Sequence, residues 1–592
     1  MKVIITTRLS RRVCRGQVPL RLISFRRLSK KEILMARKFN VGRFYLPAIG
    51  SKDTEEFLGE FDGFWDEVVS GFPPEHPFWR NVVSSKMQPW ENSIGYLCLV
   101  LFTLACTPAS GDAGLVIVCD SVQMRRVFIE WARINRWELI STGSAQGGRV
   151  DAIAQKINNL GWFAVRFLSC LYKKWFSPSV KAGGGIRGDT ALISSFYYPS
   201  SFRNGSYHDP FLGNLHDFLK KNGMKCVYLC EPLNEFDKNT VQKTSHCQDT
   251  KVYTTYSLIK WREMILALIG LYFRDIRVSE VKFMGCDMSK LIRWYAGNFI
   301  NSFNIGAEIR FKAAERLCSL QKFDRLIYGF EENVHERACI QAFRRLGHGK
   351  IIGYSHAVIY PLNLKIRLTG KEALLKPGPD AYVCTGPYAK KLLQKVGVRY
   401  PSQKMTDGCI IKDIPEISKK NGAGYNRRRI LVALDGMESS IVLLEWILEH
   451  LKMLDDFIFC LRFHPNVPAK RIVSQCINRI PDNVEISDNS LMQDIEGSLC
   501  VLYRHSSVGM QALLNGVPAV YLGIDSPLHG DPLDEFTTYK WSVYSVSELA
   551  AALEEIKSFP PEQSDELPGA ARKFLQGYFA APSEGSLKSF ID

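Results

Sequence analysis

Short apolar runs alternate with longer amphipathic segments along most of the chain, and this alternation predicts an α/β fold. Segments with apolar residues at every third or fourth position separate the runs and predict helices, for instance at 122–135, 211–223 and 387–397. The strands predicted in the first part of the chain are 115–120, 189–196, 225–231, 324–330, 350–356 and 380–386.

A second series of the same kind begins near residue 429. Its strands are almost continuously apolar, as strands buried on both faces are; they are 429–436, 456–465, 483–487, 499–506 and 518–523. Periodicity is lost at 401–428, where Pro, Gly, Asn and like charges mix, which is typical of a linker. We therefore predict two doubly wound Rossmann-type domains that face a cleft, one over 44–400 and one over 429–592. The part of the first domain up to about residue 180 matches this scheme poorly.

The net charge of +16 is concentrated at the N-terminus. Residues 1–43 contain thirteen Lys or Arg and the single acid Glu32, so the rest of the chain is close to neutral and no nucleic-acid groove is predicted. An Arg-rich segment with few acids is typical of a targeting peptide, of an anchor on an anionic membrane surface, or of a gene start placed too early, with Met35 as the true one. On each interpretation the segment stands outside the fold.

Neither the apolar runs nor the cysteines indicate an exported or membrane-spanning protein. The longest apolar run, 94–106, is shorter than the roughly 20 residues that a membrane-spanning helix needs. The sixteen cysteines lie mostly inside apolar runs and form no Cys-x-x-Cys pair. Reduced, buried thiols in a cytoplasmic protein are the expectation, without a disulfide framework or a zinc site.

The stretch Arg504–Gly523, "RHSSVGMQALLNGVPAVYLG", contains the first candidate for chemistry. Ser506 and Ser507 stand between a predicted strand and a predicted helix, directly after Arg504 and His505. Serine at this place is a common helix cap. The N-terminus of a helix also favours an anion, and the arginine and histidine would add donors. The serines are therefore either caps or part of a phosphate site.

The dipeptide His464-Pro465 is the second candidate. It ends the predicted strand 456–465, about forty residues before the serines. In a parallel sheet, ligands bind beyond the carboxyl ends of the strands. The histidine, the serines and Arg462 in the same strand are thus expected at one edge, and so is the Asp435-Gly436 turn after the first strand of this domain.

These motifs resemble a known group of enzymes. His-Pro, an acidic short helix "LMQDIEGS", a strand and "SSVGMQALLNGVPAVYLG" look like the nucleotide-binding half of bacterial sialyltransferases. They look equally like related capsule polysaccharide enzymes, including Kdo transferases and polysialyltransferases. The segments "EENVHER", "GYSHAVIYPL" and "PDAYVCTGPYAKKLL" are similar to surface carbohydrate biosynthesis proteins. The likeness spans about 190–525 and implies a GT-B fold, with 429–592 binding the nucleotide-sugar and 44–400 on the acceptor side.

The resemblance also implies site residues. In those enzymes the histidine of His-Pro and the serines contact the CMP phosphate and ribose, which assigns His464, Pro465, Ser506 and Ser507 to the donor. An acid of a (D/E)-(D/E)-G motif in the N-terminal domain is the general base. The matching residues here are Glu332 and Glu331, about 132 residues before His464, but Asn333 replaces the glycine. His356, at the end of the strand 350–356, is a further residue that would face the cleft.

The implied reaction is an inverting transfer of a sialic-acid-like sugar or Kdo from a CMP-activated donor to a surface glycan. No Asp-x-Asp triplet is present, so no metal and no other cofactor is predicted. The expected place of action is the cytoplasm at the inner face of the membrane, with the basic N-terminus in peripheral contact with lipid. Two alternatives stay open: a CDP-polyol phosphotransferase of the teichoic-acid polymerase type, and a non-catalytic GT-B-like assembly factor.

Overall fold

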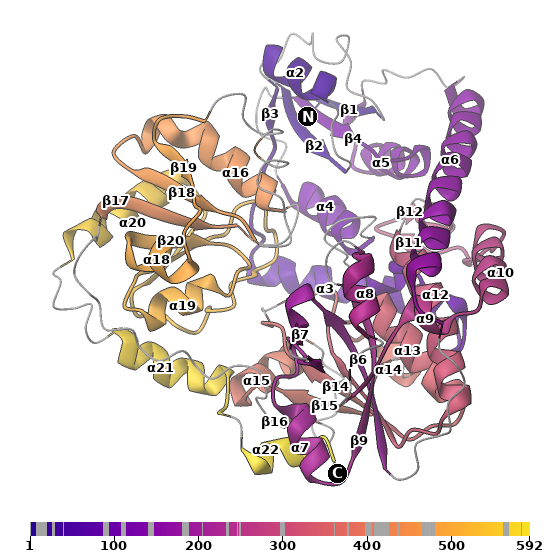
Figure 1. Ribbon diagram of the computed structural model, residues 1–592. Coiled ribbons are helices and arrows are strands. Elements are labelled where there is room, and N and C mark those ends of the chain that lie inside the picture. The colour runs from indigo at the N-terminus through magenta and orange to yellow at the C-terminus, as the bar shows by residue number, and fades with distance from the viewer. Residues whose placement is uncertain are drawn as a thin grey trace.

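The computed structural model of the chain contains three large parallel sheets, each with helices on its faces (Figure 1). It describes residues 2–6, 20–25, 30–39, 41–86, 94–107, 114–139, 147–179, 189–203, 205–232, 236–244, 247, 250–296, 302–359, 362–375, 378–396, 405–407, 426–434, 439–464, 473, 480–559, 567–581 and 583–591.

The largest sheet has seven strands in the order β10-β9-β6-β13-β14-β15-β16. The strands are β6 (Thr190–Tyr197), β9 (Lys225–Pro232), β10 (Lys251–Thr254), β13 (Arg325–Gly329), β14 (Lys350–Ser355), β15 (Ala381–Cys384) and β16 (Met405–Asp407). Its helices include α7 (Leu215–Lys221), α9 (Thr255–Leu258), α10 (Trp261–Tyr272), α12 (Ser302–Leu320), α13 (Val334–Arg345) and α15 (Pro387–Val396). All neighbouring strands are parallel, with Tyr328 of β13 opposite Ser194 of β6.

The C-terminal sheet has six parallel strands in the order β19-β18-β17-β20-β21-β22. They are β17 (Asn426–Ala433), β18 (Ile458–Arg462), β19 (Val484–Ile486), β20 (Ser498–Tyr503), β21 (Ala519–Leu522) and β22 (Lys540–Val543), with helices α16 (Ser439–His450), α18 (Leu491–Glu496), α19 (Val508–Leu514) and α20 (Val546–Ser558). Every residue of β20 and β21 is buried, which explains why these strands are continuously apolar in sequence. The two sheets confirm the predicted α/β, GT-B-like arrangement of two doubly wound domains.

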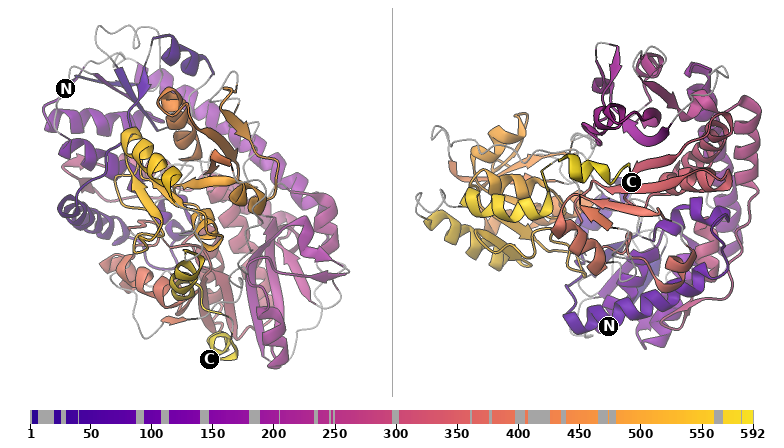
Figure 2. Two further views of the ribbon diagram at one scale, coloured as in Figure 1. Left: turned by 90° about the vertical axis from the view of Figure 1, so that its left-hand side faces the viewer. Right: turned by 90° about the horizontal axis from the view of Figure 1, so that it is seen from below.

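Two helices at the end of the chain return from the C-terminal sheet to the seven-stranded one (Figure 2). They are α21 (Leu567–Tyr578) and α22 (Glu584–Lys588). Ala580 N donates to Thr385 O across 2.7 Å, and Phe590 is fully buried in the core that α22 shares with the seven-stranded sheet. A single buried cluster contains Leu392 of α15, Leu513 of α19 and Leu575 of α21, so the two domains share packing.

The third sheet was not predicted. Its five strands, in the order β3-β2-β4-β1-β5, are β1 (Lys2–Thr6), β2 (Leu20–Ser24), β3 (Gly42–Arg43), β4 (Gly114–Val118) and β5 (Glu138–Leu139). Helices α2 (Lys30–Lys38), α3 (Ser51–Val69), α4 (Ile94–Cys106) and α5 (Val122–Ile134) surround it, and the longer α6 (Gly147–Phe176) follows. Residues up to about 139, which fit the two-domain scheme poorly, thus form a sheet of their own.

This sheet corrects the expectation that the basic segment 1–43 stands outside the fold. Strand β1 pairs with β4 and β5, and β2 pairs with β3 and β4. The apolar residues between the arginines, among them Val3, Ile5 and Ile23, are buried. The many basic residues obscured the strand pattern of β1 and β2, whose apolar side chains are buried in a core.

Deleting residues 1–34 should therefore unfold the five-stranded sheet. The deletion removes six buried apolar side chains, namely Val3, Ile4, Ile5, Leu20, Leu22 and Ile23. Burial of each contributes about 1.5–3 kcal/mol, and together they match the roughly 5–15 kcal/mol that keeps a domain folded. Hydrogen exchange of 114–118 should rise to the rate of an unfolded chain. Unchanged protection of β4 in the truncated protein would contradict this.

The remaining expectations have mixed outcomes. Within the predicted linker 401–428, residues 405–407 form the edge strand β16, where Met405 is buried, and 426–428 begin β17. None of the described helices is long and apolar enough to span a membrane, and α4, which contains the longest apolar run, is mostly buried. Each described cysteine is a free thiol.

Candidate active site

Glu331 and His356 follow neighbouring strands of the seven-stranded sheet. Glu331 stands two residues after β13, and His356 comes directly after β14. Both side chains therefore lie at the carboxyl edge of the sheet, where doubly wound folds bind ligands. Nε2 of His356 lies 3.1 Å from Oε1 of Glu331, whose side chain is 35% exposed. The structure thus pairs two of the predicted site residues.

Gly329 makes room for this pair. A side-chain carbon at position 329 would lie 2.8 Å from Nδ1 of His356, which is closer than such atoms can approach. Only glycine at the end of β13 allows the imidazole to lie against the backbone and reach Glu331.

Two more residues hold the carboxylate of Glu331. Nδ2 of Asn333 donates to Oε2 across 3.0 Å, and Nζ of Lys365 lies 4.0 Å from the same oxygen. Burial acts to raise the pKa of Glu331, but His356, Lys365 and Asn333 outweigh it and hold the pKa well below its usual range. Glu331 is thus a partly exposed carboxylate that stays ionised at neutral pH. Asn333, which replaces the glycine of the motif, donates a hydrogen bond to it.

Glu332 has different surroundings. It is 4% exposed and adopts a left-handed φ of 60°. Its Oε2 accepts from Nε of Arg337 across 2.9 Å. Arg337 also donates to Glu372 Oε1 across 3.1 Å, and Nζ of Lys86 lies 2.7 Å from Glu372 Oε2. Glu332 therefore belongs to a buried network of two carboxylates and two cations.

Glu336, on the first turn of α13, holds the loop that contains Glu331 and Glu332. Its Oε2 accepts from the backbone N–H of Glu331 across 3.1 Å. Burial, with the negative charge of Glu331, raises the pKa of Glu336 to about 8. Burial and the charge of Arg310 lower the pKa of the adjacent His335 to about 3. Both side chains are therefore mostly neutral at pH 7.

A third strand end carries another ion pair. Glu231 lies near the end of β9, and its Oε1 is 3.0 Å from Nη1 of Arg310. Arg310 is fully buried, and its Nη2 donates to Ser194 Oγ across 2.8 Å. Lys365, Arg310 and Glu231 were not among the residues predicted from the sequence. Only Glu231 gave a signal, as an acid that ends an apolar strand, because Arg310 and Lys365 come from segments without a motif.

The residues after β18 and β20 share one edge of the C-terminal sheet. The register aligns Arg462, Ala433 and Tyr503 at the ends of β18, β17 and β20. Arg504, directly after β20, is only 5% exposed, and its Nη2 donates to Asp525 O across 2.7 Å. Its Nε and Nη1 are buried and have no hydrogen-bond partner among the described residues. Buried unsatisfied donors of this kind call for a ligand or water.

The two serines differ in their hydrogen bonds. Oγ of Ser506 accepts from the backbone N–H of Val508 across 3.3 Å, so this hydroxyl caps α19. Ser507 precedes the helix directly, but its side chain makes no cap hydrogen bond. His505 lies over Gly530, where a side-chain carbon would be 2.8 Å from its Nε2.

The other residues predicted to bind the donor lie in different surroundings or outside the described residues. His464 is exposed two residues beyond β18. Arg462 donates to Asp494 Oδ2 across 2.7 Å and to Asn489 O across 2.8 Å, so its guanidinium is directed to the fully buried Asp494. Pro465, Asp435 and Gly436 lie outside the described residues. No three His, Cys, Asp or Glu side chains gather as a metal site in the part of the chain that the structure describes.

The first sheet reaches this edge as well. The segment after β3 lies against the C-terminal domain, with Arg43 Nη1 2.8 Å from Glu445 Oε2 and Leu46 N donating to Asp525 Oδ1 across 3.0 Å. Asp525 is the residue whose backbone carbonyl holds Arg504. The five-stranded domain therefore buttresses the loop that positions Arg504.

No protein-family model and no curated protein matches the chain. The chain is similar in structure to the glycotransferase of kitacinnamycin (13% identity, 69% of this chain and 99% of that one, TM-score 0.38). It is also similar to the glycosyltransferase SnogD from Streptomyces nogalater (12%, 68% and 99%, TM-score 0.36) and to UDP-GlcNAc 2-epimerase from Neisseria meningitidis (13%, 66% and 99%, TM-score 0.35). TM-scores this low do not establish a shared activity.

Proposed function

We propose that the chain is an inverting, metal-independent glycosyltransferase that moves an acidic sugar, sialic-acid-like or Kdo, from a CMP-activated donor to a surface glycan. The observation that carries the proposal is a pair of groups at the carboxyl edges of two parallel sheets. One is the partly exposed, ionised carboxylate of Glu331, and the other is the buried guanidinium of Arg504, whose Nε and Nη1 have no hydrogen-bond partner among the described residues. A base and an anion-binding cation are what a transfer from a phosphate leaving group needs.

Glu331 is proposed as the general base. As the acceptor oxygen bonds to the anomeric carbon, its proton becomes strongly acidic, so even a carboxylate of low pKa can take it. A base in this position contributes about 10²–10⁴-fold to the rate. His356 and Asn333 hold the carboxylate in one orientation. Glu332 has its carboxylate bound by Arg337 in the interior, which leaves Glu331 as the better candidate of the two.

On the donor side, Arg504, His505, Ser507 and His464 are proposed to stabilise the departing CMP phosphate. Guanidinium groups bind phosphate through paired, charge-assisted hydrogen bonds. Preorganised donors at the point where charge develops typically change turnover about 10²–10³-fold each. Helix α19, led by the serines, packs on α21, so the site is anchored to the segment that joins the two domains.

Nucleotide binding tests the proposal. Calorimetry of the full chain with CMP, CDP, UDP and GDP should give the tightest binding for CMP. Arg504→Met should weaken it about tenfold or more, since a hydrogen bond to a charged group is worth about 1.5–3 kcal/mol. Preference for CDP would favour the polyol phosphotransferase, and preference for UDP or GDP would indicate another sugar donor. Failure to bind any of the four would overturn the proposal.

The serines should separate into a cap and a ligand group. Ser506→Ala removes the bond to Val508 N and should lower the free energy of unfolding of the C-terminal domain by about 1 kcal/mol, with CMP affinity within a few-fold of wild type. Ser507→Ala should leave stability unchanged and weaken CMP binding several-fold. Melting curves and CMP titrations of both variants measure the difference. If Ser507→Ala melts earlier and binds CMP normally, both serines are caps.

Activity should persist in excess EDTA. The leaving group is a monophosphate ester, whose charge the arginine and helix N–H groups can balance without an ion. CMP release from the donor, measured before and after chelation, should differ by less than twofold. Loss of activity that Mn²⁺ restores would show that a metal takes part.

A further inference from the structure

Helices α6 and α10 lie side by side at one side of the molecule (Figure 1), and many of their apolar side chains are exposed. Of the eighteen large hydrophobic residues exposed among those that the structure describes, ten belong to this pair or follow it directly. They are Leu160, Trp162, Val165, Leu168, Tyr172 and Trp175 from α6, and Trp261, Leu266, Ile269 and Phe273 from or next to α10. We call these ten residues the α6/α10 face.

Four of the exposed residues on α6 form a continuous stripe along the helix. Val165, Leu168, Tyr172 and Trp175 recur at intervals of three and four, so they align along α6. They are 56%, 64%, 52% and 76% exposed. The opposite side of α6 is packed, with Cys170 buried in a cluster that includes Met264 and Leu268 of α10. Helix α6 thus has one apolar side that packs against α10 and a second apolar side that is exposed.

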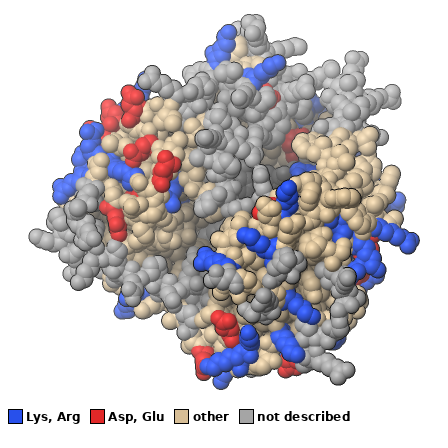
Figure 3. Space-filling model, viewed as in Figure 1, with Lys and Arg blue, Asp and Glu red and all other residues tan. Residues whose placement is uncertain are grey.

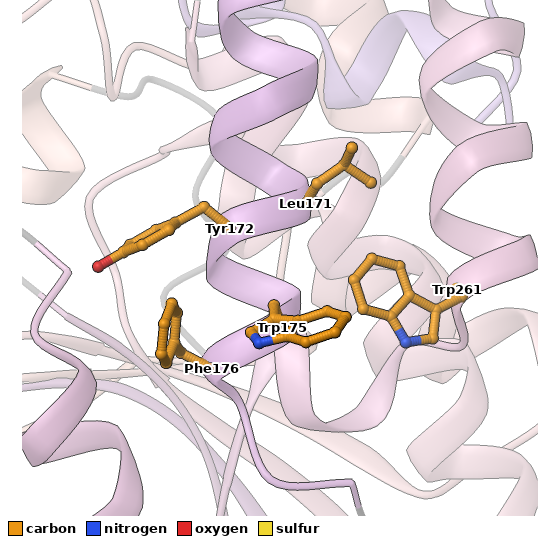
Figure 4. Close-up of a pocket in the computed structure, with 5 residues that line it drawn as sticks. All are labelled: Leu171, Tyr172, Trp175, Phe176 and Trp261. Atoms are coloured by element: carbon orange, nitrogen blue, oxygen red, sulfur yellow. The ribbon is translucent and has the colours of Figure 1, made fainter.

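The two helices run antiparallel and share one groove. Trp175 and Trp261 lie with ring centroids 6.5 Å apart at one end, and Phe163 and Tyr272 lie 4.7 Å apart at the other. The groove of about 440 Å³ between them is lined by Leu171, Tyr172, Trp175, Phe176 and Trp261. Figure 4 shows the two indole rings next to each other, with Tyr172 and Phe176 on the far side of Trp175.

Charge around the α6/α10 face is positive. Residues 160–176 contain no acid, and of their cations Arg166 and Lys173 are partly exposed, whereas Lys174 is buried. Lys260 and Arg262 are exposed beside Trp261. Two acids nearby already have partners. Asp275 Oδ2 lies 2.6 Å from Arg293 Nη2, and Glu263 Oε2 accepts from the backbone N–H of Lys260 across 2.9 Å. Elsewhere on the described surface in Figure 3, charges of both signs are interspersed.

We infer that the α6/α10 face docks on the surface of an anionic lipid bilayer. Interfacial helices carry Trp, Phe and Leu on one side and Lys or Arg beside it, and Trp and Tyr are enriched where an apolar phase meets water. A protein partner would need a rim whose charges complement this basic one. The aromatic content, the basic rim and the absence of acids from 160–176 together favour lipid.

The docking face is connected to the edge that holds Glu331. Lys174 Nζ donates to Tyr256 O across 2.8 Å, which ties α6 to α9. Helix α9 follows β10 directly, and Thr255 Oγ1 donates to Glu231 Oε1 across 2.7 Å at the end of β9. Docking would therefore bring the carboxyl edge of the seven-stranded sheet near lipid. This inference does not depend on the proposed glycosyl transfer.

Vesicle flotation of the full chain tests the inference. Wild-type protein should float with phosphatidylcholine vesicles that contain 30% phosphatidylglycerol, about tenfold more than with pure phosphatidylcholine. The double variant Leu168→Glu/Trp175→Glu should lose at least 90% of the bound protein. Leu374→Glu/Met453→Glu is the matched control, because these residues are 80% and 60% exposed but lie outside the face; it should float like wild type.

Three results would overturn the inference. The first is wild-type protein that floats with neither vesicle. The second is equal flotation of the α6/α10 variant and the control, which would assign any binding to another surface. The third is a wild-type dimer in light scattering that the α6/α10 variant dissociates, without flotation, which would make the face a contact between two copies. Circular dichroism of each variant verifies folding, and CMP binding, measured separately, stays unaffected.

Discussion

Glu331→Gln should lower the rate of CMP release from the donor by about 10²–10⁴-fold, the range for a lost general base, while CMP affinity stays within a few-fold of wild type. Gln keeps the shape of the side chain and can still accept from His356, but it cannot take a proton. The proposed nucleotide contacts lie on the other sheet, so the donor complex should form normally. Donor hydrolysis, followed as CMP release, gives a readout that needs no knowledge of the acceptor.

Asn333→Gly is the matched control for this variant. It removes the hydrogen bond to Oε2 of Glu331 and introduces the glycine of the (D/E)-(D/E)-G motif that this segment resembles, but it leaves the carboxylate in place. We expect a change of only a few-fold in turnover. If Glu331→Gln retains full turnover, the base is another group, and His356 is next to be replaced.

The pH dependence follows from the same contacts. Because His356, Lys365 and Asn333 hold the pKa of Glu331 below its usual range, the base stays ionised as the pH falls from 7 to 5. Protonation of Glu331 should therefore cause no loss of turnover in this interval. An acid limb centred near pH 4.5 or above that Asn333→Gly shifts upward would show that the base titrates as an ordinary carboxyl.

The sequence predicted the two sheets well because their signal is local. An apolar run such as 499–506 is followed by a capping serine and an amphipathic helix, and the structure has β20 and α19 there. The candidate residues at strand ends were found for the same reason: the end of a parallel strand is both a sequence feature and a place in space. His356 and Glu331 meet because β13 and β14 are neighbours.

The five-stranded sheet could not be predicted because, apart from β4, its strands are short and carry charged residues. Arg21 stands within β2, and β1 and β4 are separated by more than a hundred residues. Composition indicated a basic leader, whereas the apolar residues of β1 and β2 are buried beside β4 and build a core. Pairing between distant strands leaves no local pattern to read.

The choice between Glu331 and Glu332 also needed three-dimensional information. Adjacent residues in a loop point in different directions, and burial and the contact with Arg337 show that the carboxylate of Glu332 turns inward. The partners that decide their roles, Lys365 for one and Arg337 and Glu372 for the other, come from separate segments. A family motif places the pair of acids but does not orient them.

Glu332→Gln should be a folding defect rather than a catalytic one. Glu332, Glu372, Arg337 and Lys86 form a neutral network whose side chains are at most 4% exposed. Removing one carboxylate charge leaves an excess positive charge in the interior. Breaking a buried pair in this way costs about 3–5 kcal/mol, so the melting temperature should fall by several degrees and the soluble yield should drop.

Glu336→Gln provides the comparison, because it is the same change at a buried glutamate of the same segment. Burial and Glu331 raise the pKa of Glu336 to about 8, so the folded protein holds this proton at pH 7, and a neutral amide should be tolerated. A raised pKa contributes stability below the unfolded value near 4.5 that is lost as the pH rises through 8. Wild type should therefore lose stability relative to Glu336→Gln between pH 5 and 9, whereas the defect of Glu332→Gln should persist across that interval. A Glu332→Gln protein that melts like wild type but releases no CMP would instead make Glu332 the base.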